Sequence, residues 1–496
     1  MASANKTTGL KRHLGLTSLA ATGICSMLGA GINVIPFMIQ RSVPGIGPMV
    51  LPAFMLAALP AVLAGLAYAI LASAMPRAGG SYIYASRSLH PYLGFLASFA
   101  QWFGLSIAIG VVSYVIVPFV RDVAVALSWQ KMAELLETGS IRLTLSLAVL
   151  WLFVGINLRG GKLYERTLIP LMILMFAMGA VVIFAGFGYD QGDFATALMS
   201  REGRAVPSAP VEGFSLKTLL SGAAVLFASF IGFDSIAQAG GEAKNPARNL
   251  PLAIAIAIGG VGAFYLLFTG AVYHAVPWQF IAAEARHSDL TAPGLLGYVL
   301  SPGWTVIIIA GAAIALINDL PAMLLAVSRL MFAWAEDGIF PAAVARVHPR
   351  WHTPHVAILA SGGMATAGVL GCHFAGDFFL GVDLLVTSML FNFGVMCLSL
   401  LTLKRTNPAL AERIQVLKSP RIHRPLAGLG VLLLGAFLVI HIRKDLAADL
   451  AAWYFHSTWL WLLVMLLASL IFFVEYRRLL RSGANTNRIF STLPPE

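Results

Sequence analysis

The chain has 496 residues, of which 58% are hydrophobic and 11% are charged. This composition excludes an ordinary soluble globular protein, in which about a quarter of the residues are charged. The formal net charge is +11, but the basic residues lie mainly in short connections between apolar runs, which argues against nucleic acid as the partner. The three cysteines lie in or beside apolar runs without metal-ligand spacing, so we expect no disulfide, metal or other cofactor.

About twelve apolar runs recur along the chain, each long enough to cross a bilayer as a helix of about 20 residues. If the N-terminus is cytoplasmic and the helices alternate in direction, most of the 33 Lys and Arg residues lie on the cytoplasmic side. This is the positive-inside bias of membrane proteins. We therefore expect a multi-pass protein of the plasma (inner) membrane, with the lipid bilayer as a partner and both termini cytoplasmic.

The first apolar run, over about residues 14–40, contains residues that disfavour a continuous helix. Gly29, Ala30 and Gly31 are three small residues in a row, and Pro36 follows. Glycine destabilises a helix by about 1 kcal/mol and proline by about 3 kcal/mol relative to alanine. In hydrocarbon, the freed backbone groups need a cavity or a ligand. We expect a helix that breaks in its middle and turns its amides toward an anionic group; close packing of helices through small residues is the alternative.

A second interrupted run lies at residues 226–242, where Gly232 and Asp234 stand among apolar residues. An aspartate at the centre of a membrane helix costs about 2.5–3.5 kcal/mol on insertion scales. Such a residue is retained with a partner, a cavity or a proton, and is functional by default. The alternative is a structural role as the cap of a half-helix, and the two roles are compatible.

A second intramembrane acid, Asp319, lies deep in the eighth apolar run between Asn318 and Pro321. Two interpretations remain open for it. Its carboxylate either faces a cavity and pairs with the cationic group of a substrate, or is buried against Asn318, Arg329 or a backbone donor.

The order of the runs predicts two repeats of five helices, each opening on a broken helix, followed by two more helices. Residues 189–213 form a polar outer linker between the repeats, and we expect the polar C-terminal tail to be disordered. The expected boundaries are 1–13 (N-terminal tail), 14–188 (first repeat), 189–213 (linker), 214–403 (second repeat), 404–424 (basic cytoplasmic loop), 425–480 (helices 11 and 12) and 481–496 (C-terminal tail).

Several motifs resemble the amino acid–polyamine–organocation (APC) family of permeases. They are spread over about the first 400 residues, and they are Gly-Ala-Gly-Ile at 29–32, Phe-Ala-Ser-Phe-Ile-Gly-Phe-Asp at 227–234, Glu-Ala-Lys-Asn-Pro at 242–246, Pro-Arg-Ala-Gly-Gly-Ser-Tyr-Ile-Tyr at 76–84 and Glu-Asp-Gly-Ile-Phe-Pro at 336–341. The resemblance implies an all-α polytopic membrane fold similar to that of the bacterial leucine transporter. That fold is a five-plus-five inverted repeat with discontinuous helices 1 and 6 and a substrate near the bilayer midplane.

The resemblance also implies a set of site residues. A substrate carboxylate is expected on the helix 1 amides, and an α-amine on carbonyls at both helix breaks; the residues are Met27, Gly29, Ala30, Gly31, Phe230, Ile231 and Phe233. Asp234 stands where many members carry an acid linked to gating or proton coupling. Asp319 is not expected from the family pattern, and the lysine that replaces a sodium ion in some proton-coupled members is absent from residues 170–176.

These observations predict a secondary active transporter that moves amino acids across the plasma membrane by alternating access. Transport is coupled to protons or occurs by exchange, with Asp234 and Asp319 as coupling or gating residues. Two alternatives remain: an exchanger of polyamines or cationic amines, and a membrane sensor that binds amino acids without transporting them. An enzyme is not expected, because the sequence has no phosphate-binding loop with a Walker lysine, nucleophile elbow, metal-binding helix or haem motif.

Overall fold

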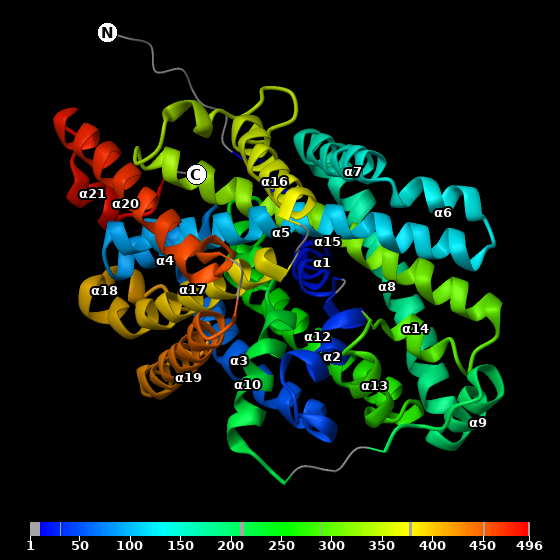
Figure 1. Cartoon of the computed structure of the whole chain (residues 1–496). Coiled ribbons are helices and arrows are strands. Elements are labelled where there is room, and N and C mark those ends of the chain that lie inside the picture. Colours follow the sequence, from blue (N-terminus) through cyan, green and yellow to red (C-terminus); the bar gives the residue numbers. More distant parts are fainter. Residues whose placement is uncertain are drawn as a thin grey trace.

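The computed structural model describes residues 10–29, 31–208, 213–288, 290–375, 379–449 and 452–494. Across these residues the secondary structure is helical, apart from two isolated β-bridges (Figure 1). Twelve helical segments of this described part are long and apolar enough to cross a membrane. The twelve spans and the all-α polytopic fold expected from the sequence are confirmed.

The spans are formed by single helices or by short series of helices. In chain order they are α1–α2 (Leu16–Met27, Gly31–Ser42), η1–α3 (Gly47–Met49, Val50–Ala74), α5 (Pro91–Ala126), α7 (Gly139–Arg159), α8 (Gly161–Gly188), α10–η2–α11 (Leu216–Leu226, Phe227–Phe230, Asp234–Gln238), α12 (Pro246–Ala275), α15 (Pro302–Glu336), α16 (His355–Ala375), α17 (Phe379–Thr406), α19 (Pro420–Leu446) and α20 (Ser457–Arg481). The connecting helices are α4 (Gly80–Ser88), α6 (Gln130–Glu137), α9 (Gln191–Glu202), α13 (Trp278–Glu284), α14 (Ala292–Leu296), η3 (Ala342–Ala345), α18 (Pro408–Ala411), η4 (Trp453–Phe455) and α21 (Thr486–Ser491).

The first span lies inside the bundle, whereas the last ones lie at its edge. In the most apolar window of α1–α2, 82% of the residues are buried by other parts of the protein, compared with 28% in α20. The long helix α5 crosses the bundle and packs against α15, α16 and α17, while α7 and α20 lie on opposite sides of the view in Figure 1. An apolar helix enclosed by protein has no need to present a continuous apolar surface to lipid, so α1–α2 is where a break is tolerated.

The two expected helix breaks are present, and they touch each other. Helix α1 ends at Met27 and α2 begins at Gly31; in the sixth span the chain leaves helical geometry between Phe230 and Asp234. Gly232 has φ +133°, and a Cβ built on it would lie 2.2 Å from the Ser26 carbonyl oxygen. A glycine is therefore required there, both for the left-handed backbone and for the close approach.

The connecting segments contain further helices, and one expectation about them needs correction. The expected polar linker contains the helix α9, which Asp190 starts with a capping box and which buries Phe194 and Leu198. In the described residues 481–494, the tail that we expected to be disordered instead forms α21 and packs against α4. Its hydrogen bonds are described below.

Candidate substrate site at the two helix breaks

The carbonyl end of α1 is held by a tyrosine from α12. The Tyr265 hydroxyl donates a hydrogen bond to the Met27 carbonyl oxygen, and both residues are buried. The helix stops at Leu28. The Leu28 N–H still bonds the Ile24 carbonyl, but the Leu28 backbone, with φ −87° and ψ 70°, is no longer helical. The carbonyl end of a half-helix carries a partial negative charge, so this end of the break favours a cationic group. Tyr265 was not among the residues predicted from the sequence.

The Asp319 carboxylate lies directly against Gly29, on the other side of the same break. A Cβ built on Gly29 would be 1.8 Å from Asp319 Oδ2 and 3.0 Å from Oδ1. Gly29 therefore has no room for a side chain because the carboxylate occupies that space. Gly31 begins α2 next to this point, whereas Ala30 lies outside the described residues.

Two of the structural partners considered for Asp319, Asn318 and Arg329, form hydrogen bonds with other residues. Asn318 donates its side-chain amide to Cys25 Sγ at 2.9 Å, and Arg329 Nε donates to Glu242 Oε1 at 2.6 Å. Asp319 is 3% exposed, and its Oδ1 is a buried acceptor without a hydrogen-bond partner in the described part of the chain. The carboxylate therefore faces the break without a counter-ion from these residues.

The predicted aromatic residues of the sixth span line the other break, and they pack on different neighbours. The Phe230 ring lies edge-on to Phe54 at 5.6 Å and to Tyr265 at 5.9 Å between ring centroids. The Phe233 ring stacks on Phe393 of α17 at 4.9 Å. Ile231 lies between them with an extended backbone (φ −74°, ψ 135°). The structure thus brings Phe230 to the helix 1 break through Tyr265, and directs Phe233 toward α17.

Asp234 is buried in a hydrogen-bonded network of neutral side chains. Its carboxylate accepts from the side-chain amide of Gln101 on α5 and from the Gly232 N–H at 3.2 Å. Gln101 Oε1 in turn accepts from Gln238 and from Asn392, each at 3.3 Å. The network continues through the Ser81 and Tyr68 side chains, whose oxygens are 2.7 Å apart. Gln101 thus acts in interhelical bonding, and Asp234 is connected to α3, α4, α5 and α17.

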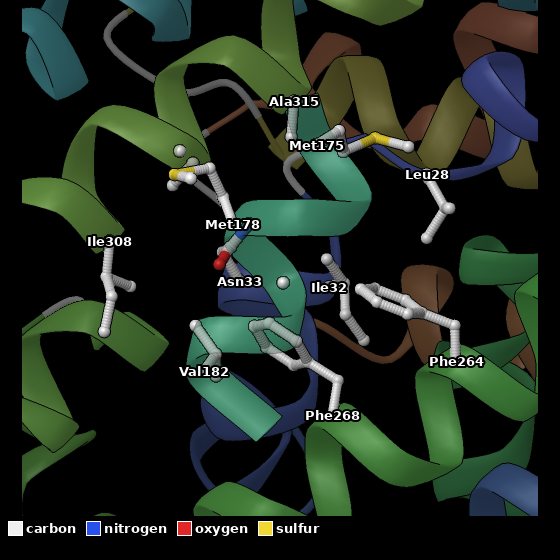
Figure 2. A pocket seen from close by; sticks show the side chains of 13 residues that line it. Leu28, Ile32, Asn33, Met175, Met178, Val182, Phe264, Phe268, Ile308 and Ala315 are labelled. Atoms are coloured by element: carbon white, nitrogen blue, oxygen red, sulfur yellow. The ribbon is translucent and has the colours of Figure 1, made fainter. Parts of the chain in front are cut away.

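A small cavity adjoins the break between α2, α8, α12 and α15 (Figure 2). Its walls are apolar or thioether side chains, and Asn33 is the one polar side chain among the described residues that line it. The cavity volume of about 20 Å³ is enough for a water molecule and too small for an amino acid. In the state that the structure shows, this cavity therefore holds no more than a water molecule.

The face where the described chain begins and ends, which we call the terminal face, is closed by two buried ion pairs. Arg87 of α4 forms a two-pronged contact with Asp337, whose Oδ2 also accepts from the Tyr82 hydroxyl at 2.6 Å. Burial and the Asp337 charge raise the pKa of Tyr82 well above its usual value, so its hydroxyl stays protonated as a donor. The second pair is Arg329–Glu242, with Arg329 Nε 2.6 Å from Glu242 Oε1.

The C-terminal tail covers the first of these ion pairs. Arg87 donates to the carbonyl oxygens of Ile489 and Thr492, each at 3.2 Å, and Arg77 donates to that of Pro494 at 3.0 Å. The Phe490 ring lies 5.8 Å from the Arg87 guanidinium carbon. These contacts join residues about 400 positions apart, which is why the polar composition of the tail did not predict them.

Comparison with known proteins identifies the family. The family model described as amino acid permease matches residues 14–474. The chain belongs to the APC family of amino acid permeases. This membership agrees with the two broken helices and with the motifs that surround them.

Three relatives illustrate the range of the family. The chain is 27% identical over 383 residues to "Cationic amino acid transporter 4" of Mus musculus, covering 72% of this chain and 54% of the relative. It is 26% identical over 434 residues to "Methylthioribose transporter" of Bacillus subtilis (strain 168), covering 86% and 88%. It is 30% identical over 367 residues to "Cationic amino acid transporter 9, chloroplastic" of Arabidopsis thaliana, covering 68% and 58%. The chain thus spans about half the length of the mouse relative.

Proposed function

We propose that this permease is a secondary active transporter that moves amino acids across the plasma membrane by alternating access. The observation that carries this proposal is the meeting of two broken helices, with Gly232 against the Ser26 backbone, inside the bundle where the flanking residues are buried. Free backbone groups inside a bilayer are tolerated where they bind a ligand or line a cavity. The family membership and the names of the relatives support the same class of activity.

In the proposed complex, the substrate carboxylate binds the amino-terminal end of α2 at residues 29–31, where the helix dipole is positive. The α-ammonium group binds carbonyls at the end of α1, near Met27, and at the sixth-span break, near Phe230 and Ile231. Met27 already has a partner in the Tyr265 hydroxyl, which substrate binding shares or replaces. With α1 and α11 rocking against α5 and α15, the same residues face each side of the membrane in turn.

The terminal face is the cytoplasmic face in this proposal, in agreement with the distribution of basic residues. Opening the pathway to the cytoplasm then requires α4 and the segment around residue 242 to separate from α15, breaking the Arg87–Asp337 and Arg329–Glu242 pairs. Breaking a buried ion pair is costly when a charge is left without a partner. These two pairs therefore stabilise the state that is closed to the cytoplasm.

Asp234 is the residue that we assign to proton coupling. It is fully buried, and its partners Gln101 and the Gly232 N–H are neutral donors. The carboxylate has no neighbouring cation among these bonds to fix its charge, and it opens the half-helix α11, which is next to the substrate. A proton taken up by Asp234 would weaken its bond with Gln101 and so link protonation to movement of the sixth span.

The test is transport by the purified full-length chain in proteoliposomes. A panel of labelled neutral, acidic and cationic amino acids is presented with and without internal substrate, and with and without an inward proton gradient. Gradient-driven accumulation is expected for at least one amino acid. Substrate binding detected by thermal stabilisation, combined with no flux under any condition, would overturn transport in favour of a sensor.

A further inference from the structure

Asp319 is a buried acid whose carboxylate lies at the place where a substrate is expected to bind. It is near the middle of α15 and is 3% exposed. Its Oδ1 has no hydrogen-bond partner among the described residues. Buried carboxylates normally have a donor or a cation, so this oxygen is available to a ligand.

The described side chains around Asp319 supply no cation. Arg329 lies ten residues further along α15, about 15 Å away at 1.5 Å per residue, and it is paired with Glu242. The titratable groups near Asp319 include Cys25 on α1 and Tyr265 on α12. Tyr265 donates its hydroxyl proton to the Met27 carbonyl. Neither residue brings a positive charge to the carboxylate.

The position of the carboxylate determines what kind of ligand fits. Asp319 fills the space beside Gly29 that a side chain would otherwise occupy, next to the amides at the start of α2. An amino acid bound there places its own carboxylate beside that of Asp319, and two carboxylates that share a site repel each other. A ligand that has an ammonium group and no carboxylate meets Asp319 and the carbonyl end of α1 without this repulsion.

We propose that Asp319 binds the ammonium group of the transported substrate, and that the site prefers alkyl amines, such as diamines, to the amino acids from which they differ by one carboxylate. This inference rests on the proposed transport function and specifies its substrate class. The Asp319 carboxylate lies beside the position proposed above for the substrate carboxylate, so an amino acid binds there less tightly than the amine that lacks a carboxylate.

The experiment compares pairs of compounds that differ only in the carboxylate. Proteoliposomes with the full-length protein are loaded with unlabelled cadaverine or lysine, with putrescine or ornithine as a second pair, and the same compound is added outside in labelled form. Half-saturation concentrations are measured by counterflow. The wild-type protein is expected to bind each diamine at least about tenfold more tightly than its amino acid, which corresponds to a difference of about 1.4 kcal/mol.

The Asp319→Asn variant keeps the side-chain volume and removes the charge. Loss of the charged partner is expected to weaken cadaverine binding at least about 30-fold while lysine affinity stays equal or improves. Asp122→Asn is the control, because Asp122 is a part-exposed acid at the far end of α5 that pairs with Arg121. If Asp319→Asn does not fold, as judged by gel filtration, the wild-type pairs alone decide the question.

The outcomes separate this inference from the proposed function. Transport of lysine with cadaverine excluded, or equal loss of both in a folded Asp319→Asn protein, overturns the assignment of Asp319 and leaves transport standing. Absence of any flux, for amines and for amino acids, overturns the proposed function itself. Diamine preference that disappears in Asp319→Asn supports both.

Discussion

The two buried acids of the spanning helices, Asp234 and Asp319, have opposite surroundings. Asp234 accepts two hydrogen bonds and is connected through Gln101 to four neighbouring helices. Asp319 has an oxygen with no partner among the described residues and lies against the bare backbone of Gly29. The difference indicates two different roles: an acid within a network responds to the arrangement of helices, whereas an acid without a partner is available to a ligand.

The largest expected effect comes from Gly232→Ala, which separates the two breaks and so removes the setting of both acids. The new Cβ would lie 2.2 Å from the Ser26 carbonyl oxygen, and the backbone has φ +133°. We expect transport to fall at least about 100-fold, consistent with the strain of about 1–3 kcal/mol for such a backbone plus the clash. Uptake and gel filtration measure the effect. The control is Gly259→Ala on α12, where a Cβ meets nothing within 4 Å; equal losses in the two variants would contradict a special role for the contact.

A smaller and more local effect is expected from Gly29→Ala, which acts on Asp319 alone. The added methyl group would displace the Asp319 carboxylate, whose Oδ2 lies 1.8 Å from the ideal position of that methyl carbon. Cadaverine transport should fall by about tenfold or more, which corresponds to about 1.4 kcal/mol in affinity or barrier. Gly363→Ala on α16, in open space, is the matched control. Unchanged cadaverine affinity in a folded Gly29→Ala protein would mean that the carboxylate does not act at the break.

An intermediate effect is expected from Arg87→Lys, which weakens the contact between Asp337 of the terminal face and its cationic partner. Arg87→Lys keeps the charge and loses the two-pronged contact with Asp337. Truncation of a buried pair costs about 3–5 kcal/mol, and a conservative change should cost less. We expect a lower unfolding temperature. We also expect a larger population of the state open to the cytoplasm, detected as faster chemical labelling of a cysteine placed at residue 78. Arg121→Lys, in an exposed pair, should change neither quantity.

The smallest effect is expected from removal of residues 484–496. The tail contributes carbonyl acceptors to Arg77 and Arg87 and the Phe490 ring, while the Arg87–Asp337 pair remains. Loss of neutral hydrogen bonds costs about 0.5–1.5 kcal/mol each. We expect exchange to become a few-fold faster because the cytoplasmic face opens more easily. Slower exchange would contradict a stabilising role of the tail in the closed state.

Local features of the sequence were sufficient to predict the helices and their breaks. Runs of apolar residues predict the spans, and the small residues at 29–31 and at Gly232 predict where helices stop, because both depend on neighbours within a few positions. The contacts that define the site could not be predicted in this way. Asp319 meets Gly29, and Arg87 meets Asp337 250 residues away, through packing that composition does not encode. The expected alternative partner of Asp319, Arg329, is instead paired with Glu242.

The same reasoning explains why the roles of the two acids were difficult to assign from sequence. Both interrupt apolar runs, and the insertion cost is the same for each. The two acids differ in their hydrogen-bond donors. Gln101 and Gly232 donate to Asp234, whereas Asp319 Oδ1 has no donor in the described part of the chain. The donors to Asp234 come from another helix and from a backbone that has already left helical geometry.

The most direct measurement compares Asp234→Asn and Asp319→Asn side by side in proteoliposomes, each tested with cadaverine and lysine and with and without a proton gradient. We expect the two variants to fail differently. Asp234→Asn should abolish gradient-driven accumulation and retain exchange with unchanged selectivity, whereas Asp319→Asn should lose the preference for cadaverine and retain the response to the gradient. If both variants lost the same property, or if neither lost any, the division of roles between the two acids would be contradicted.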